Sequence, residues 1–178
     1  SIRYNISRTP LREALSKLEM MGIIERVPFK GVFLKKFNSE KVKEIYEIRL
    51  ELEYIIYKEI KEIMTDKHIK KVEKIVAKGQ KYNNSNNLAK FSETLEEFDN
   101  YLYSLSKKEL SLKILSELSF YMNIFKKTNP NMQETVDEHE KIIEALKEKD
   151  DEKIYKALEE HLYNAANYVV KTFDKISI

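Results

Sequence analysis

Apolar residues recur at helical spacing along most of this chain. The first stripe follows the i, i+3, i+4, i+7 pattern of a helix buried on one side and consists of Leu11, Ala14, Leu15 and Leu18. Thr9 followed by Pro10 predicts the start of this helix, and Gly22 its end. Two β-prone runs follow at 23–27 and 31–37. The segment between them predicts a small hairpin with a basic tip.

The pattern stays helical from Ser39 onward, with short breaks. It predicts six helices, at roughly 40–64, 66–81, 88–105, 109–127, 132–148 and 152–176. Their connections are short, as is typical of antiparallel neighbours in a bundle. We therefore expect two domains, at 1–38 and 39–178.

Composition favours the same fold class. The 178 residues include only three Gly and three Pro, too few for the many tight turns of a sandwich or barrel, so the chain is expected to be mainly α. No apolar run is long enough to span a membrane, and no secretion signal is visible, so we expect a cytoplasmic protein. The absence of Cys excludes disulfides and thiolate metal sites.

Charge is distributed unevenly along the chain. Residues 1–36 carry eight basic and three acidic side chains, a net charge of +5, although the whole chain has a net charge of only +2. Four of the five arginines lie in the first 26 residues. Arg suits forked contacts with phosphates and guanine edges, so this segregation indicates a nucleic-acid surface, while a plain solvated face is the alternative.

The N-terminal segment carries a specific motif, SRTPLREAL, then LE, GII and PFKG. This order closely resembles the winged helix-turn-helix of GntR-family bacterial transcription regulators. The resemblance implies that Ser7, Arg8, Thr9 and Arg12 begin a recognition helix that contacts operator DNA. It also implies that Lys30 and Gly31 form the wing tip. The helical pattern agrees, since it places Arg8, Arg12 and Ser16 away from the apolar stripe, free to enter a major groove.

The family's DNA-binding domain begins with a further helix and most of a second one before the position that matches Ser1. We therefore expect a partial winged helix-turn-helix, from an N-terminally truncated product or an incomplete head. In either case the stripe of Leu11, Leu15 and Leu18 is expected to be poorly covered.

Residues 39–176 are similar to the FCD ligand-binding domain of the FadR-type subgroup of GntR regulators. The matching pieces are EIYEIRLELE, Phe98 with its neighbours, Glu138-His139 with the apolar residues that follow, and Glu160-His161-Leu162. In metal-binding members an Asp, a His four residues later and two further His residues separated by 21 intervening positions hold one divalent metal. Here the two histidines are His139 and His161, whereas the earlier pair reads Leu95 and Asp99.

Periodicity points to the same three residues. Asp99, His139 and His161 each lie on the inward stripe of a different predicted helix. Two neutral imidazoles and one carboxylate suit Zn²⁺, Ni²⁺ or Mn²⁺, with positions left open for water or an effector. The alternative is that both histidines are hydrogen-bonded core residues. Because Leu95 removes one family ligand, we expect weak retention of a metal.

Arg49 also lies on an inward stripe, and a buried Arg must be paired. An ion pair with an acidic side chain is the favoured interpretation, and an anchor for an anionic effector is the alternative.

The sequence as a whole predicts a homodimeric, ligand-responsive transcription regulator that binds operator DNA and a small carboxylic-acid effector. One alternative is a metal- or metabolite-binding module without DNA binding. Another is a metal-dependent helical-bundle enzyme that would use Asp99, His139 and His161. Motifs typical of enzymes are absent, since there is no Gly-rich phosphate loop and no Gly-x-Ser-x-Gly.

Overall fold

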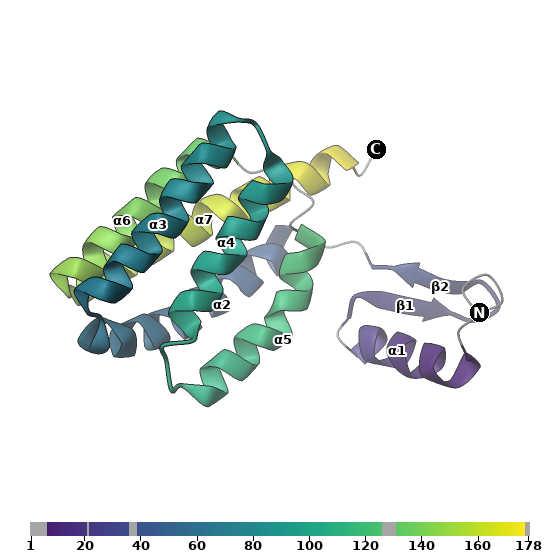
Figure 1. The fold of residues 1–178 in the computed structure, drawn as a ribbon. Coiled ribbons are helices and arrows are strands. Elements are labelled where there is room, and N and C mark those ends of the chain that lie inside the picture. Colours follow the sequence, from purple (N-terminus) through teal and green to yellow (C-terminus); the bar gives the residue numbers. More distant parts are fainter. Residues whose placement is uncertain (1–6, 21, 36–38, 126–130, 177–178) are drawn as a thin grey trace. The chain divides into compact units, whose positions relative to one another are not determined.

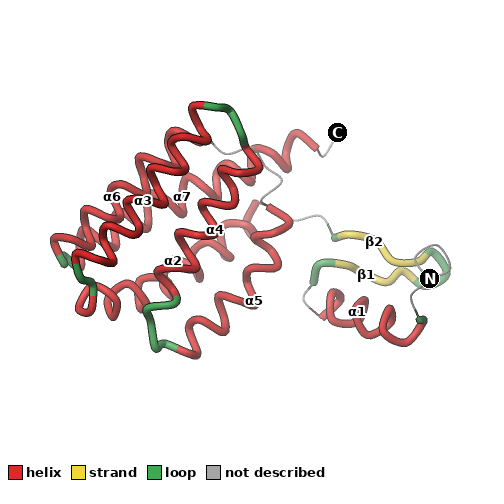
Figure 2. Tube along the Cα trace, viewed as in Figure 1, coloured by secondary structure: helices red, strands yellow, loops and turns green. Residues whose placement is uncertain are grey.

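A computed structural model of the chain describes residues 7–20, 22–35, 39–125 and 131–176. The chain separates into two compact units, Ser1–Asn38 and Ser39–Ile178. Both strands of the described residues belong to the first unit, and the second is helical (Figure 2). The mainly helical class predicted from the sequence is confirmed.

The first unit consists of helix α1 (Arg8–Met20) and strands β1 (Ile24–Val27) and β2 (Gly31–Leu34). The strands pair antiparallel, with Ile24 opposite Leu34 and Val27 opposite Gly31. Gly22 has a φ of +70°, the left-handed conformation that commonly follows the end of a helix. The hairpin is shorter than predicted, and residues 36–38 lie outside the described part.

Two local expectations for this unit need correction. Helix α1 begins at Arg8 rather than at Thr9-Pro10, and Pro10 is tolerated there because first-turn N–H groups have no partner within a helix. Ala14 is exposed rather than buried, whereas Leu11, Leu15 and Leu18 are half-buried. Ile23 and Ile24 are the buried apolar residues among those described in this unit.

The second unit contains α2 (Ser39–Ile63), α3 (Asp66–Asn84), α4 (Leu88–Tyr103), α5 (Glu109–Phe125), α6 (Met132–Glu148) and α7 (Asp151–Ile176). All six helices predicted from Ser39 onward are therefore present. The main difference is that α3 continues through Tyr82, Asn83 and Asn84, which were expected in a loop. The chain turns just afterwards, at Asn86 with a φ of +50°, and the Asn87 side chain caps α4 by accepting from the Lys90 N–H.

Helix α2 packs against α5 and α7, α3 packs against α4 and α6, and α6 also packs against α7 (Figure 1). Their inward faces form one apolar core, whose most fully buried members include Ile56, Ile60, Phe91, Phe98, Leu102, Leu146 and Leu158. Among the described residues, charged and polar side chains form a cluster within this core between α2, α4, α6 and α7.

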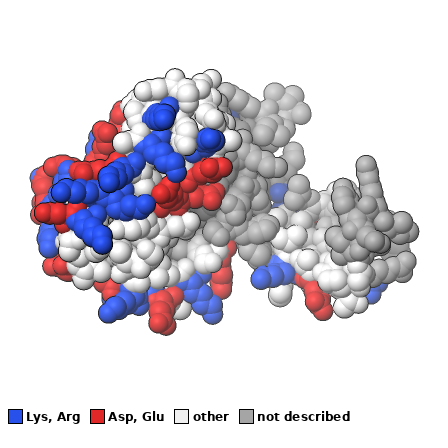
Figure 3. Space-filling model, in the orientation of Figure 1, with Lys and Arg blue, Asp and Glu red and all other residues white. Residues whose placement is uncertain are grey.

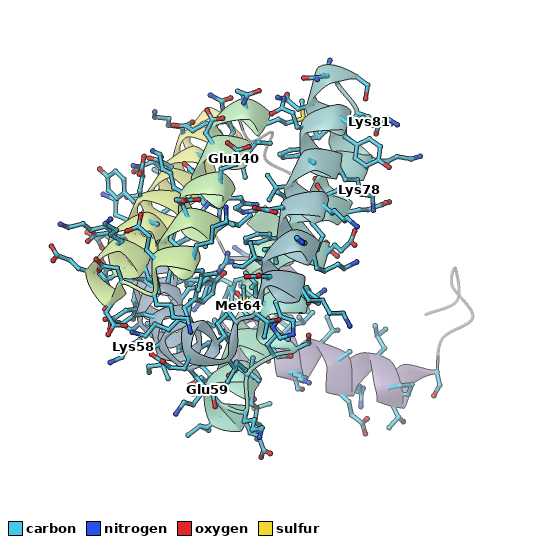
Figure 4. The ribbon with its side chains drawn as sticks, turned by 60° about the vertical axis from the view of Figure 1, so that its left-hand side comes forward. Lys58, Glu59, Met64, Lys78, Lys81 and Glu140 are labelled. Carbon is cyan, nitrogen blue, oxygen red and sulfur yellow. The ribbon has the colours of Figure 1, made fainter. Side chains whose placement is uncertain are left out.

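The outer faces of the bundle are highly charged. Lys and Arg side chains alternate with Asp and Glu over the face seen in Figure 3. Lys78 of α3, for example, points away from the bundle in Figure 4 and pairs with Glu97 of α4 at 2.8 Å. Within the described residues, none of the helices combines the length and apolar character needed to cross a membrane.

Candidate functional site

Arg49 is at the centre of one half of the polar cluster in the bundle. Its Nη2 donates to Asp99 Oδ2 of α4 at 3.1 Å, and its Nε donates to Glu53 Oε1, one turn further along α2. The Tyr103 hydroxyl donates to the same Glu53 oxygen at 2.7 Å. The ion pair expected for Arg49 is therefore present, and it joins two helices.

Arg49 and Glu53 are both largely removed from water, so each charge is stabilised mainly by the other. The Arg49 side chain is 13% exposed and that of Glu53 only 2%. Burial disfavours the charge on Arg49, but the charge of Glu53, followed by Tyr103 and Asp99, more than compensates and raises the pKa of the guanidinium further. Burial together with Glu53 likewise raises the pKa of Tyr103 well above its ordinary value. Arg49 is thus a permanent buried cation held between two carboxylates.

The other half of the cluster joins α6 to α7. His161 Nδ1 lies 2.8 Å from Glu138 Oε2, and Asn164 Nδ2 donates to Glu138 Oε1 at 2.7 Å. Glu138 is 4% exposed, so these two contacts satisfy a carboxylate that is almost completely removed from water. A carboxylate on one ring nitrogen fixes the orientation of the imidazole and leaves Nε2 for another partner.

His139 lies between the two halves. Its ring stacks on Phe98 of α4, with 4.2 Å between ring centroids, and its centroid lies 4.9 Å from that of His161. Burial lowers the pKa of His139 well below its ordinary value, and the neighbouring His161 and Arg49 lower it further. His139 is therefore a neutral, buried imidazole at neutral pH.

The structure brings together two of the three residues predicted to hold a metal. His139 and His161 are neighbours, whereas Asp99 is engaged by Arg49. Among the described residues, no three His, Asp or Glu side chains form a group that could hold a metal ion. A buried guanidinium near the histidines also opposes a second cation. As arranged here the donor set does not fit a metal, and the predicted metal site stays a prediction.

Sequence reasoning missed the partners Glu53, Tyr103, Glu138 and Asn164. Three of them had a usable signal, because each lies three or four residues from a predicted site residue on the same helix. Glu53 follows Arg49, Tyr103 follows Asp99 and Asn164 follows His161 in this way. Glu138 had none, since it is adjacent in sequence to His139, and neighbouring residues of a helix do not face each other.

The residues predicted to contact DNA lie at two places in the first unit. Ser7, Thr9 and Arg12 are exposed at the start of α1, and Lys30 and Gly31 are exposed at the hairpin turn. Gly31 has a φ of +112°, which only Gly adopts without strain. The backbone of Arg8 belongs to α1, but its side chain lies outside the described part.

Two further polar residues of α1, Ser16 and Glu19, bond to the hairpin of the same unit. Arg26 of β1 donates to the Ser16 hydroxyl at 2.9 Å and pairs with Glu19 at 2.8 Å. Ser16, expected on the face free for DNA, is therefore engaged with the hairpin. These bonds fix α1 along β1, so that α1 begins at the end of the unit where the hairpin turns (Figure 1).

Comparisons with known proteins cover both units. Residues 44–164 match the FCD domain. The chain is 24% identical over 175 residues to the HTH-type transcriptional repressor RspR of Escherichia coli K12, spanning 95% of this chain and 76% of that protein. It is 26% identical over 170 residues to the gluconate operon transcriptional repressor of Bacillus licheniformis, spanning 89% and 68%. The solved structure of E. coli McbR/YncC superposes with a TM-score of 0.77 at 21% identity, covering 94% of this chain and 87% of that one.

Proposed function

Because this chain belongs to the FCD domain family and is a GntR-family transcriptional regulator, we propose that it binds operator DNA through its first unit and a small carboxylate effector through the polar cluster of its second. The two repressors named above are transcriptional regulators and not enzymes, which argues against a helical-bundle enzyme.

The exposed start of α1 carries the DNA part of the proposal. Thr9 and Arg12 are both exposed there, and the first-turn N–H groups of a helix suit a phosphate. A helix of this kind enters the major groove with the residues of its N-terminal half on base edges. Lys30 and Gly31 at the hairpin turn, at the same end of the unit, add a contact to the neighbouring backbone.

Substitution of Arg12 tests this. A duplex selected from a random-sequence pool by the 178-residue chain serves as the probe. Arg12→Ala should weaken binding by about 1–3 kcal/mol if the guanidinium reads a base, whereas Lys17→Ala, an exposed control near the other end of α1, should leave the affinity unchanged. Equal affinities of wild type and Arg12→Ala in an anisotropy titration would exclude this assignment.

The Arg49–Asp99 pair carries the effector part. Asp99 is the more exposed partner, at 29% against 13% for Arg49. An incoming carboxylate can take the place of Asp99 on Arg49 Nη2 and keep a second carboxylate on the buried guanidinium beside Glu53, which a simple loss of Asp99 would not do. The similarity to a repressor of a gluconate operon supports a carboxylate of the sugar-acid class.

This exchange would separate α4 from α2 at one contact. Helix α2 begins at Ser39, directly after the boundary of the first unit in the sequence. A displacement of α2 on effector binding would therefore be transmitted along the chain to the DNA-binding unit. The ligand binds more tightly to the arrangement in which Arg49 has left Asp99 and so increases the population of that arrangement. The shift in this equilibrium cannot exceed the difference in the ligand's affinity for the two arrangements.

Calorimetric titration with gluconate, lactate and citrate tests the exchange. Arg49→Gln should abolish binding of the acid, whereas Asp99→Asn should strengthen it by freeing the guanidinium. Lys141→Gln, which removes an exposed ion pair with Glu160 on α6 and α7, is the matched control. If Asp99→Asn weakens the binding of every acid that the wild type takes up, Asp99 is part of the effector contact and the exchange is wrong.

A further inference from the structure

The hairpin turn of the first unit contains an unusual residue. The chain reverses through Pro28, Phe29 and Lys30, and the Lys30 N–H donates to the Val27 carbonyl at 3.0 Å. Pro at the second position and a φ of +63° at the third, Phe29, are features of a type II β-turn. That third position favours Gly or Asn, because other side chains crowd their own backbone in the left-handed region.

Phe29 is also completely exposed, with a relative accessibility of 110%. The turn therefore combines a strained backbone with an apolar ring that gains nothing from burial in the described part of the chain. Both features disfavour Phe for the fold alone. Strained backbone positions are concentrated at functional sites, so the strain at Phe29 makes this turn a candidate for a binding contact.

The ring is presented beside the residues proposed to contact DNA. Arg26, which comes just before the turn, is bonded to Ser16 and Glu19 of α1. Since α1 and β1 run in opposite directions, the turn projects toward the end of the unit where α1 begins (Figure 1). Phe29 thus belongs to the same end as Thr9 and Arg12, and its neighbour Lys30 is exposed as well.

We infer that Phe29 contacts the minor groove of DNA and inserts its ring at a base step, while Lys30 holds an adjacent phosphate. This rests on the DNA binding proposed above. A phenyl ring has no partner on the phosphate backbone, whereas apolar side chains that enter the minor groove partly unstack a base step and are buried there. Pyrimidine–purine steps unstack most readily, so the ligand is a duplex with such a step where the turn lies.

Three variants separate the roles of ring and charge on the selected duplex. Phe29→Asn should weaken binding about tenfold, in line with the loss of a buried Phe contact, without changing the salt dependence, because no phosphate contact is lost. Lys30→Ala should lower the slope of log affinity against log salt by about one. Phe33→Ala removes another exposed Phe from the same hairpin and should leave DNA affinity unchanged.

A fluorescent base reports the unstacking directly. With 2-aminopurine placed at successive positions of the duplex, the wild type should raise the emission at one step and Phe29→Asn should not. Because Asn tolerates the left-handed backbone, this variant should unfold at a temperature no lower than the wild type. If Phe29→Asn loses DNA affinity but keeps the unfolding temperature of the wild type, the Phe29 ring contributes to DNA binding and not to the stability of the fold.

The outcomes distinguish this inference from the proposed function. If Arg12→Ala weakens binding and Phe29→Asn binds and unstacks like the wild type, the inference fails alone. If the wild-type chain retains no duplex, the DNA-binding proposal fails and this inference with it, whereas an Arg12→Ala variant of unchanged affinity excludes only the role assigned to Arg12. A change in the sedimentation of Phe29→Asn without DNA would assign the ring to a protein contact and overturn the inference.

Discussion

At the scale of single residues, the most informative feature is that the bundle core contains charges which cannot be removed one at a time. Arg49 is held by Glu53 and Asp99, and Glu138 by His161 and Asn164. Buried charge networks of this kind contribute little net stability compared with apolar packing, yet the loss of one partner is costly. Such a cluster suits a site whose partners change when a ligand enters.

Tyr46 gives a pH-dependent test of this environment. Burial raises the pKa of its hydroxyl from 10.0 to about 12, with Arg49 opposing the rise and Glu53 adding to it. The unfolded chain loses this proton from about pH 10, the folded chain only near 12, so stability falls as the pH rises through this window. Two pKa units correspond to a loss on the order of 2–3 kcal/mol.

Tyr46→Phe should therefore lose less stability between pH 9 and 11 than the wild type in urea denaturation. The buried Tyr57 and Tyr103, whose pKa values are also raised by burial, leave part of the alkaline loss in place. Tyr163→Phe, a change at an exposed tyrosine, is the matched control. The same alkaline loss in Tyr46→Phe and wild type would contradict the assigned environment.

Zinc titration tests how far Arg49 excludes a metal. The wild type should bind zinc weakly, because Asp99 is engaged and a guanidinium lies near the histidines. Arg49→Gln removes the guanidinium from Asp99 and from the neighbourhood of the histidines, so it should bind zinc more tightly, and adding His161→Ala should cancel the gain. Tight, stoichiometric zinc binding by the wild type, lost in His139→Ala and His161→Ala, would instead show that Asp99 leaves Arg49 for the metal.

At the scale of elements, α3 and α4 approach closely at one glycine. A Cβ on Gly79 would lie 3.1 Å from Thr94 Oγ1 and 3.7 Å from the Phe91 ring. The Thr94 hydroxyl is itself fixed, since it donates to the Phe91 carbonyl at 2.6 Å. A methyl group at position 79 would therefore require Thr94 to shift slightly, and a larger side chain would press against the Phe91 ring as well.

Gly79→Leu should cost about 1–3 kcal/mol of unfolding free energy by overpacking this contact. Gly79→Ala should stay within about 1 kcal/mol of the wild type, because the gain in helix propensity offsets the tight contact with Thr94. Ala77→Leu, on the exposed side of the same helix, is the matched control. Chemical denaturation measures all three, and a Gly79→Leu variant as stable as the control would show that α4 can move away.

Elements were more predictable than the contacts between them. The bounds 132–148 of α6 follow directly from its apolar spacing, whereas the end of α3 was missed because Tyr82, Asn83 and Asn84 can extend a helix by a turn. Periodicity also placed Arg49, His139 and His161 inward. It could not pair Asp99 with Arg49, because that contact depends on the order and rotation of helices 50 residues apart.

At the scale of the whole molecule, we propose that exposed apolar side chains of α2 and α5 form the contact surface of the predicted homodimer. Ile48 and Ile55 of α2 are each 42% exposed, and Leu110 of α5 is 71% exposed. These helices pack against each other, so their exposed residues belong to adjacent elements. Regulators that read two half-sites need two DNA-binding heads, which a symmetric dimer supplies.

Ile55→Glu should therefore convert a dimer into a monomer of 21.2 kDa in light scattering at micromolar concentration. Tyr163→Glu, which changes a side chain 65% exposed on α7, should leave the dimer intact. DNA affinity should fall with Ile55→Glu even though the first unit is unchanged. A monomeric wild type would contradict the predicted homodimer, and a dimeric Ile55→Glu would place the contact elsewhere.

The pairing of Arg49 with Asp99 also constrains how this sequence can diverge. Losing Arg49 alone leaves the buried Glu53 and the half-buried Asp99 without the guanidinium, and losing Asp99 alone leaves Arg49 with only one of its two carboxylates; breaking a fully buried pair costs about 3–5 kcal/mol. That is comparable with much of a domain's total stability. Descendants of this protein should therefore change positions 49 and 99 together, or change one only after a bound ligand has taken over the orphaned charge. Effector dependence would then arise as the repair of a broken pair, before any selection for sensing.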